Sequence, residues 1–217
     1  MVKEFLQPYL FNHERPVLII DDSSVYRSAA KGILQKLGFE ARNVHQAQNG
    51  REAKVLCAEH NYAIIFYDYN LGAGLSGYHL MEELVSEKAI ASDCTNIVVS
   101  AEGAVNVVRS FMELSPDGYL LKPISHDILK QKLPTIVKTK ATLSEAYIAL
   151  DQGRFEQVLE MTEEMIQEDE STLIAAQALK ARAQIELNLL HDARNTLSVF
   201  SRSRIYPLAT LCSSTSP

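Results

Sequence analysis

Cysteine and tryptophan are scarce in this chain of 217 residues, which has three cysteines and no tryptophan. Because Cys57, Cys94 and Cys212 are odd in number and far apart, neither a disulfide framework nor a zinc site is predicted. No apolar run reaches the roughly 18 residues that a membrane-spanning helix needs. The N-terminal residues 1–14 are too interrupted by charge and proline to be a signal peptide. We therefore expect a cytoplasmic protein with reduced cysteines, no membrane contact and a packed N-terminal arm at 1–14.

Basic residues become rare toward the C-terminus. Residues 1–140 contain 15 Lys or Arg and 16 Asp or Glu, whereas residues 141–217 contain 6 and 11, so the second part carries −5 of the total charge of −6. Seven acids and no base lie between Glu156 and Glu170. Nucleic acid repels such a surface, so no nucleic-acid partner is expected, and the acids are interpreted as a solvated helix face.

Short apolar runs alternate with helix-like stretches over the first two thirds of the chain. The expected strands are 16–21, 40–44, 62–68, 96–100 and 118–121, each followed by a helix, at about 24–37, 46–59, 77–87, 104–114 and 125–139. Five such units in order predict a five-stranded parallel sheet, doubly wound, with right-handed crossovers and helices on both faces. The second strand is weakly patterned and is expected near an edge. No Gly-x-Gly-x-x-Gly follows the first strand, which disfavours a dinucleotide-binding fold.

Four of the apolar runs end in residues that could handle phosphate. Asp21 and Asp22 follow the first run, Asp68 the third, Ser100 the fourth and Lys122 the fifth. Ligands of open parallel sheets bind outside the carboxyl ends of the strands, so these side chains are expected to converge at one edge. Three carboxylates, a hydroxyl and an amine predict a site for a divalent cation and a phosphoryl group.

The three carboxylates repel one another, and a cation would remove that repulsion. Two like charges 4 Å apart cost about 1 kcal/mol in water and about 4 kcal/mol at an effective dielectric constant of 20. Mg²⁺ is the expected ion, because it prefers oxygen ligands and is usually held by one or two carboxylates with water. We expect Asp22 and Asp68 to bind it directly, Asp21 to act through water, and the backbone carbonyl of Asn70 to add a further ligand.

Asp68 would keep one carboxylate oxygen free of the metal. That oxygen can attack phosphorus and form an acyl phosphate. Lys122 would then neutralise the phosphoryl oxygens, and Ser100 would donate its hydroxyl. Because Pro123 follows Lys122, a cis peptide bond is predicted there.

With these motifs, residues 15–139 resemble the receiver domain of bacterial two-component response regulators. The matching segments are the acidic pair in Asp-Asp-Ser-Ser-Val-Tyr-Arg, the acceptor in Phe-Tyr-Asp-Tyr-Asn-Leu, the hydroxyl in Val-Val-Ser-Ala-Glu and the Tyr-Leu-Leu-Lys-Pro segment. The resemblance implies a flavodoxin-like (βα)5 fold and Mg²⁺-dependent phosphorylation of Asp68 by a histidine kinase or phosphotransfer protein. It also implies a signalling protein that catalyses only its own phosphorylation and slow dephosphorylation.

The resemblance also implies a switch. Ser100 would turn toward the phosphoryl group and Tyr119 would turn inward with it, which alters the face made by the fourth helix, fifth strand and fifth helix. Asn70 and Glu102 would tune the lifetime of the phosphoryl group. The chain departs from many receivers at Gly72, where they have proline, and its 72–76 loop is about one residue longer, which affects the entry to the next helix.

Residues 140–205 contain helical patterns without strands and resemble tetratricopeptide repeats. Two stretches align at an offset of 35 residues, pairing Gly153 with Asn188, Phe155 with Leu190 and Val158 with Ala193. The usual tryptophan of such repeats is missing, and generic helical-hairpin packing is the alternative. Residues 206–217 form a polar tail that is expected to be disordered.

The favoured function is a response regulator whose output is protein binding through the helical repeats. The alternative is a pseudo-receiver, a scaffold that acts without phosphorylation. A phosphatase of the haloacid dehalogenase type needs an acid two residues after its nucleophile, and Asn70 disfavours it. The kinase, the target protein, the direction of the switch and homodimer formation remain open from sequence.

Overall fold

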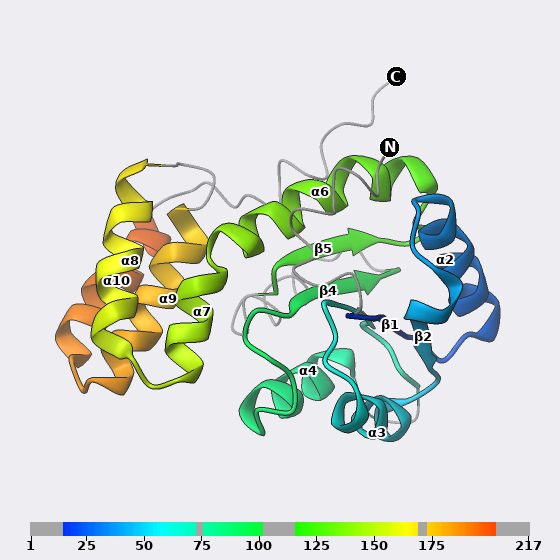
Figure 1. The fold of residues 1–217 in the computed structure, drawn as a ribbon, viewed down its shortest axis with the longest axis horizontal. Coiled ribbons are helices and arrows are strands. Elements are labelled where there is room, and N and C mark those ends of the chain that lie inside the picture. The colour runs from blue at the N-terminus through cyan, green and yellow to red at the C-terminus, as the bar shows by residue number, and fades with distance from the viewer. Residues whose placement is uncertain (1–14, 73–75, 102–115, 169–172, 203–217) are drawn as a thin grey trace. The chain divides into compact units, whose positions relative to one another are not determined.

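The computed structural model describes residues 15–72, 76–101, 116–168 and 173–202, which belong to two compact units, Met1–Ser144 and Glu145–Pro217 (Figure 1). The sequence places the boundary after residue 139, and the structure divides the chain after Ser144. The expected N-terminal arm, the expected helix at 104–114 and the expected tail at 206–217 lie outside the described residues.

The first unit is built on a five-stranded parallel sheet. Its strands are β1 (Val17–Ile20), β2 (Val44–Ala47), β3 (Ile64–Asp68), β4 (Thr95–Ser100) and β5 (Gly118–Leu121). They lie in the order β2-β1-β3-β4-β5, so the chain crosses over after β2, and β2 is an edge strand as expected. The α/β class and the parallel sheet predicted from the sequence are therefore confirmed.

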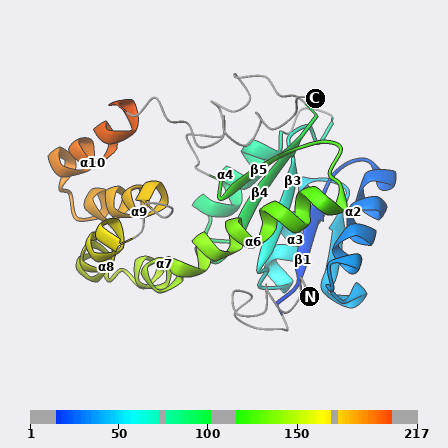
Figure 2. The same cartoon turned by 90° about the horizontal axis from the view of Figure 1, so that it is seen from above.

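Helices cover both faces of this sheet (Figures 1 and 2). They are α2 (Ser24–Lys36), α3 (Gly50–Glu59), α4 (Gly77–Ser86) and α6 (His126–Thr142). The helices α2 and α6 lie on one side and contribute Leu34, Leu129 and Leu133 to the main apolar core. The other side carries α3 and α4. Serine or asparagine caps each of the four helices by accepting a hydrogen bond from the amide three residues on.

The second strand and its following helix differ from the sequence prediction. The expected strand at 40–44 is wrong, because residues Ala41–Asn43 form a 3₁₀ turn and β2 begins at Val44. The next helix was expected from residue 46 and begins at Gly50, where the Asn49 side chain accepts from the Glu52 amide at 3.0 Å. In return the Glu52 carboxylate accepts from the amide of Gln48 at 2.9 Å. Together the two hydrogen bonds fix the helix start, with Asn49 as the cap residue.

The second unit is helical throughout its described residues. Its helices are α7 (Ser144–Asp151), α8 (Phe155–Glu168), α9 (Leu173–Glu186) and α10 (Leu190–Arg202), with α9 packed against both α8 and α10. Two backbone hydrogen bonds close the end of α7 around Gly153, and the same two bonds recur 35 residues later around Asn188. Both residues have left-handed backbone conformations, with φ of 70° and 60°. The aligned pairs from the sequence occupy matching places: Phe155 and Leu190 begin helices, and Val158 and Ala193 are buried.

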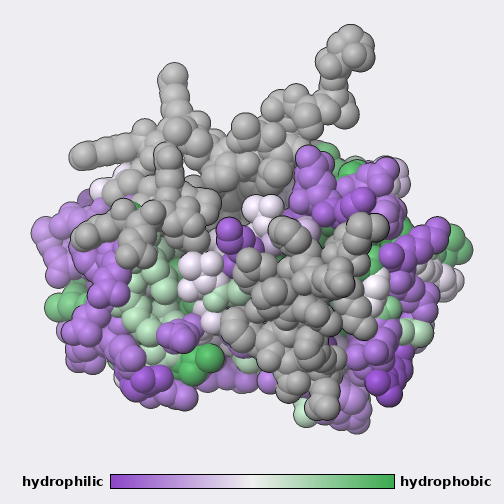
Figure 3. All heavy atoms as spheres, turned by 45° about the horizontal axis from the view of Figure 1, so that its top comes forward, coloured by the Kyte–Doolittle hydropathy of each residue, from purple (hydrophilic) through white to green (hydrophobic). Residues whose placement is uncertain are grey.

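The described surface is largely polar. Figure 3 shows hydrophilic residues over much of the described part of one face, with hydrophobic residues in smaller areas. Exposed large hydrophobic side chains in the first unit include Val25, Val55 and Val85, which lie on three different helices. Among the described helices, none is long and apolar enough to cross a membrane.

Candidate acidic site at the carboxyl ends of the strands

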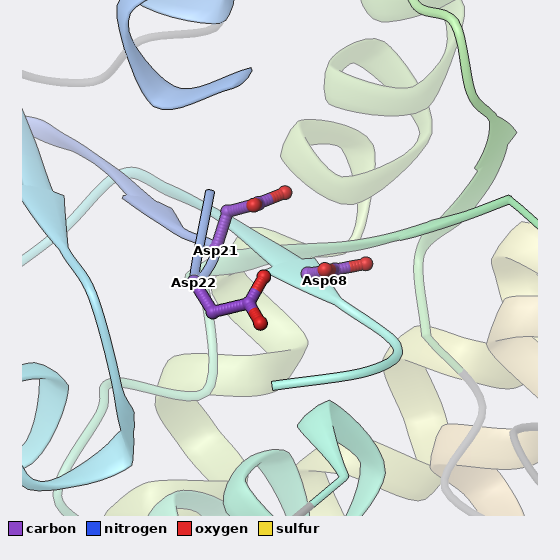
Figure 4. A group of neighbouring side chains, drawn as sticks. All are labelled: Asp21, Asp22 and Asp68. Carbon is purple, nitrogen blue, oxygen red and sulfur yellow. The ribbon is translucent and has the colours of Figure 1, made fainter. Parts of the chain in front are cut away.

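Three carboxylates meet where β1 and β3 end (Figure 4). Asp21 and Asp22 directly follow β1, Asp68 is the last residue of β3, and one oxygen of each carboxylate lies within 4.8 Å of the others. Asp21 is 1% exposed and Asp68 6% exposed, whereas Asp22 faces solvent. The side chains expected to converge from the sequence therefore do so, with two inside the protein and one at its surface.

Lys122 brings a positive charge to the two buried acids. It follows β5, and its Nζ atom lies 2.6 Å from Asp21 Oδ2 and 2.9 Å from Asp68 Oδ2. The Lys122–Pro123 peptide bond is cis, as predicted. The Lys122 amide donates to the carbonyl of Ser100 at 2.7 Å, so the ends of β4 and β5 are joined beside the acids. The contact between Lys122 and Asp21 thus joins residues that are 101 positions apart in the chain.

The protonation of Asp68 and Lys122 reflects this crowding. Burial raises the pKa of Asp68 above its ordinary value, and the charge of Asp21 adds to the rise, against hydrogen bonds from Lys122 and the Asn70 amide that lower it. Burial lowers the pKa of Lys122, but its hydrogen bonds to Asp21 and Asp68 outweigh burial and leave the pKa raised. The lysine therefore stays charged, and the surroundings of Asp68 disfavour its ionised form.

The first turn of α2 supports the acidic pair in a way that the sequence reasoning missed. The Ser23 amide donates to Asp21 Oδ1 at 2.8 Å. The Arg27 guanidinium donates to the backbone carbonyls of Asp21 and Asp22 at 2.6 and 3.1 Å. The Tyr26 ring lies beneath the Lys122 ammonium, with Nζ 4.2 Å from the ring centroid. The only sequence signal for Tyr26 and Arg27 is their place in the chain. A helix that starts at Ser24 has its first turn next to Asp21 and Asp22.

The loop after Asp68 passes close to the acids. Gly77, the first residue of α4, approaches so tightly that a Cβ atom there would lie 2.0 Å from the Asp68 carbonyl oxygen. Gly72 has φ of +70°, and a Cβ atom there would lie 3.3 Å from Asp22 Oδ2. Asn70 is exposed, and its backbone forms an isolated antiparallel β-bridge with that of Ser76 across the loop. Its backbone amide donates a hydrogen bond to Asp68.

The expected switch residues lie near the site. Ser100 is buried at the end of β4, and Tyr119 is buried in β5, paired with Val98 of β4. Glu102, expected to tune the lifetime of a phosphoryl group, lies outside the described residues. The strands therefore bring together Asp21, Asp22, Asp68, Ser100 and Lys122, with Tyr119 on the neighbouring strand.

The donor atoms suit a hard divalent cation. All three acids offer carboxylate oxygens, and their spacing permits a shared ion. Because Asp22 is exposed, one side of the group is open to water molecules, which Mg²⁺ tends to retain. Asp21, Asp22 and Asp68 are accordingly the residues that would hold the ion.

Comparison with known proteins agrees with this geometry. Residues 17–134 match the model of the response regulator receiver domain. The chemotaxis protein CheY homolog of Campylobacter jejuni is 29% identical over 124 residues, which cover 57% of this chain and 92% of that protein. The chemotaxis protein CheY1 of Helicobacter pylori is 28% identical over 124 residues, covering 57% and 97%.

A solved structure shows the same fold. The CheY-like receiver domain protein of Methanospirillum hungatei superposes with a TM-score of 0.51 at 20% identity, covering 58% of this chain and 95% of that one. The matched region contains all five strands and ends within α6, so the helices of the second unit lie beyond it. On the evidence of the family match and the site, this chain belongs to the response regulator receiver domain family, whose members act in two-component signalling with histidine kinases or phosphotransfer proteins.

Proposed function

We propose that the chain is a response regulator that accepts a phosphoryl group on Asp68 and relays this state to a partner protein through its helical unit. The observation that carries the proposal is the position of Lys122, whose Nζ contacts both Asp21 and Asp68. In the unmodified protein this ammonium pairs with two buried carboxylates, and the same position places it beside any group attached to Asp68. An acceptor needs such an amine, because its phosphoryl group brings additional negative charge.

The transfer step uses the Asp68 carboxylate as nucleophile. One oxygen attacks the phosphorus of a phosphohistidine, the P–N bond breaks with its electron pair leaving on the imidazole nitrogen, and an acyl phosphate forms. Lys122 neutralises the phosphoryl oxygens, and Ser100 donates a hydroxyl hydrogen bond to them. Mg²⁺, when bound, supplies further positive charge against the phosphoryl oxygens. Water attack on the phosphorus later returns Asp68 to its free state.

The chemistry of the site can be tested by mass measurement. The full chain is incubated with acetyl phosphate and Mg²⁺, and we expect the intact mass to rise by one phosphoryl group. D68N is expected to gain none. D127N is the matched control, because the Asp127 side chain is 95% exposed in α6 and it should be phosphorylated like wild type. No added phosphate on wild type, or the same addition on D68N, would contradict the proposal and favour a phosphorylation-independent scaffold.

We propose that the output is protein binding. The hydrogen-bond pattern that recurs around Gly153 and Asn188 supports a resemblance of the second unit to tetratricopeptide repeats, which form binding surfaces by stacking helical hairpins. In this scheme phosphorylation alters the face of β5 and α6, from which the chain continues into α7. Affinity capture with wild type and D68N, each with and without acetyl phosphate, tests the output. The captured proteins should change with phosphodonor for wild type only.

A further inference from the structure

The ammonium of Lys122 has three different neighbours in the structure. Two are the carboxylates of Asp21 and Asp68, at 2.6 and 2.9 Å. The third is the ring of Tyr26, whose centroid lies 4.2 Å from Nζ. That distance is well inside the roughly 6 Å over which the face of an aromatic ring attracts a cation. Lysine has a flexible four-carbon stem, so contacts at its end determine where the charge lies.

These neighbours differ in what a metal ion would do to them. Asp21 and Asp68 belong to the acidic group that could hold a divalent cation, so their negative charge would be shared between that ion and Lys122. A second cation nearby also repels the ammonium. The Tyr26 ring contributes no metal ligand, and its contact with Lys122 does not depend on the carboxylates. Of the three contacts, only the ring contact is independent of metal binding.

We propose that Tyr26 is a positioning residue that keeps the Lys122 ammonium beside Asp68 when a divalent cation occupies the acidic group. The inference rests on the proposed phosphorylation of Asp68 and adds a determinant of its rate. Tyr26 lies in the first turn of α2, three residues after the helix cap Ser23. Its ring also packs against the apolar core of the sheet, which fixes the ring as a platform.

The hydroxyl of Tyr26 provides a sharp control. Its oxygen is buried and has no hydrogen-bond partner among the described residues, so the contact with Lys122 depends on the ring alone. Tyr26→Phe keeps the ring and leaves no partner unsatisfied. Tyr26→Leu removes the ring's attraction for the cation but keeps an apolar side chain against the core. Tyr26→Met is a second ring-free variant, because its flexible side chain adapts to the space left by the ring.

The test measures the position of Lys122 directly. In the full chain labelled with ¹³C-lysine, the ε-methylene protons of Lys122 should be shifted upfield by the ring in wild type and Y26F, with Mg²⁺ present. The shift should vanish in Y26L and Y26M. In parallel, the rate of phosphorylation by acetyl phosphate should stay near wild type in Y26F and fall about 2- to 30-fold in Y26L and Y26M, the factor that matches the usual strength of a cation–π contact.

The outcomes separate this inference from the proposed function. If wild type gains no phosphate, the proposed function fails, whereas the upfield shift still reports on the Tyr26 contact. If wild type is phosphorylated and the folded ring-free variants react at the same rate, the inference is wrong. Loss of the upfield shift in wild type on adding Mg²⁺ would also overturn it. A rate loss in Y26F equal to that in Y26L would assign the role to the hydroxyl and contradict the inference as well.

Discussion

Asp68 lies in surroundings that disfavour its ionised form. It lies 6% exposed beside Asp21, and burial together with that neighbouring charge raises its pKa. Lys122 offsets part of this unfavourable charge. The arrangement therefore favours any event that brings positive charge to the site, such as the binding of a divalent cation.

Asp68→Asn is expected to stabilise the metal-free protein at pH 7, by about 0.5–2 kcal/mol in the free energy of unfolding. A pKa raised in the folded state means that ionisation of Asp68 destabilises the fold, and this penalty grows as pH rises above the unfolded value of about 4. Below that value the carboxyl is protonated in both states and the gain should disappear. Urea unfolding at about pH 3 and at pH 7 without Mg²⁺ measures the difference in unfolding free energy between the two chains.

The control for this prediction is Asp127→Asn, which removes an exposed acid outside the site and should show no such dependence on pH. Saturating Mg²⁺ should narrow the difference in unfolding free energy between wild type and D68N. The ion is expected to stabilise wild type more, because only wild type has all three acids. A D68N variant that is less stable than wild type at pH 7 would contradict the interpretation of Asp68 as a strained acid.

At the scale of elements, the sequence predicted the bounds of β1, β3, β4 and β5 to within two residues, because each contains a continuous apolar run. The strand at β5 was predicted with its observed bounds, since its apolar residues form one run. The edge strand β2 was misplaced, because its middle residues His45 and Gln46 are only half-buried and carry no hydrophobic signal. The pattern of Asn49 followed three residues later by Glu52 is a helix-start signal in the sequence, and it predicts the observed start of α3.

The site residues divide into those that the sequence could predict and those that it could not. Residues at strand ends were predictable, because topology alone brings Asp21, Asp68 and Lys122 to one edge. Tyr26 and Arg27 were not, since their roles depend on how far α2 is rotated about its own axis. A helix rotation of one residue is about 100°, and no sequence pattern here fixes that rotation closely enough to assign a ring to a lysine.

Gly77→Ala tests how closely the start of α4 packs against the end of β3 at Asp68. The new Cβ atom would lie 2.0 Å from the Asp68 carbonyl oxygen and 3.0 Å from its carbon, and backbone atoms cannot rotate away. The start of α4 must therefore shift, at a cost of about 2–3 kcal/mol in unfolding free energy. Urea unfolding measures this cost, and phosphorylation by acetyl phosphate should slow because the backbone of Asp68 moves as well.

The matched variant is Gly32→Ala in the middle of α2, where an added Cβ atom meets nothing within 4 Å. It should stabilise the protein by about 0.5–1 kcal/mol, the usual gain from replacing glycine by alanine inside a helix. Equal effects of the two substitutions would show that the close approach at Gly77 has no energetic consequence.

For the whole molecule, the division into two units means that the proposed metal site and the proposed binding module belong to different parts of the chain. The acidic group lies in Met1–Ser144, and the recurring helical hairpins lie in Glu145–Pro217. The second unit is small, and two hairpins bury little apolar surface compared with a longer array. The proposed function therefore requires that phosphorylation in the first unit changes the second unit.

Calorimetry of the full chain is expected to resolve two unfolding transitions. Mg²⁺ at 100 times its dissociation constant adds about 2.7 kcal/mol to the first unit, which raises that transition by roughly 5–10 °C. The transition of the second unit should stay in place, because none of the three acids belongs to it. Acetyl phosphate with Mg²⁺ should then move the second transition as well, in wild type and not in D68N, if phosphorylation of Asp68 changes the stability of the helical unit.

A single transition that moves as a whole with Mg²⁺ would show that the chain unfolds as one cooperative body. A second transition that ignores phosphorylation would show that the helical unit does not sense Asp68.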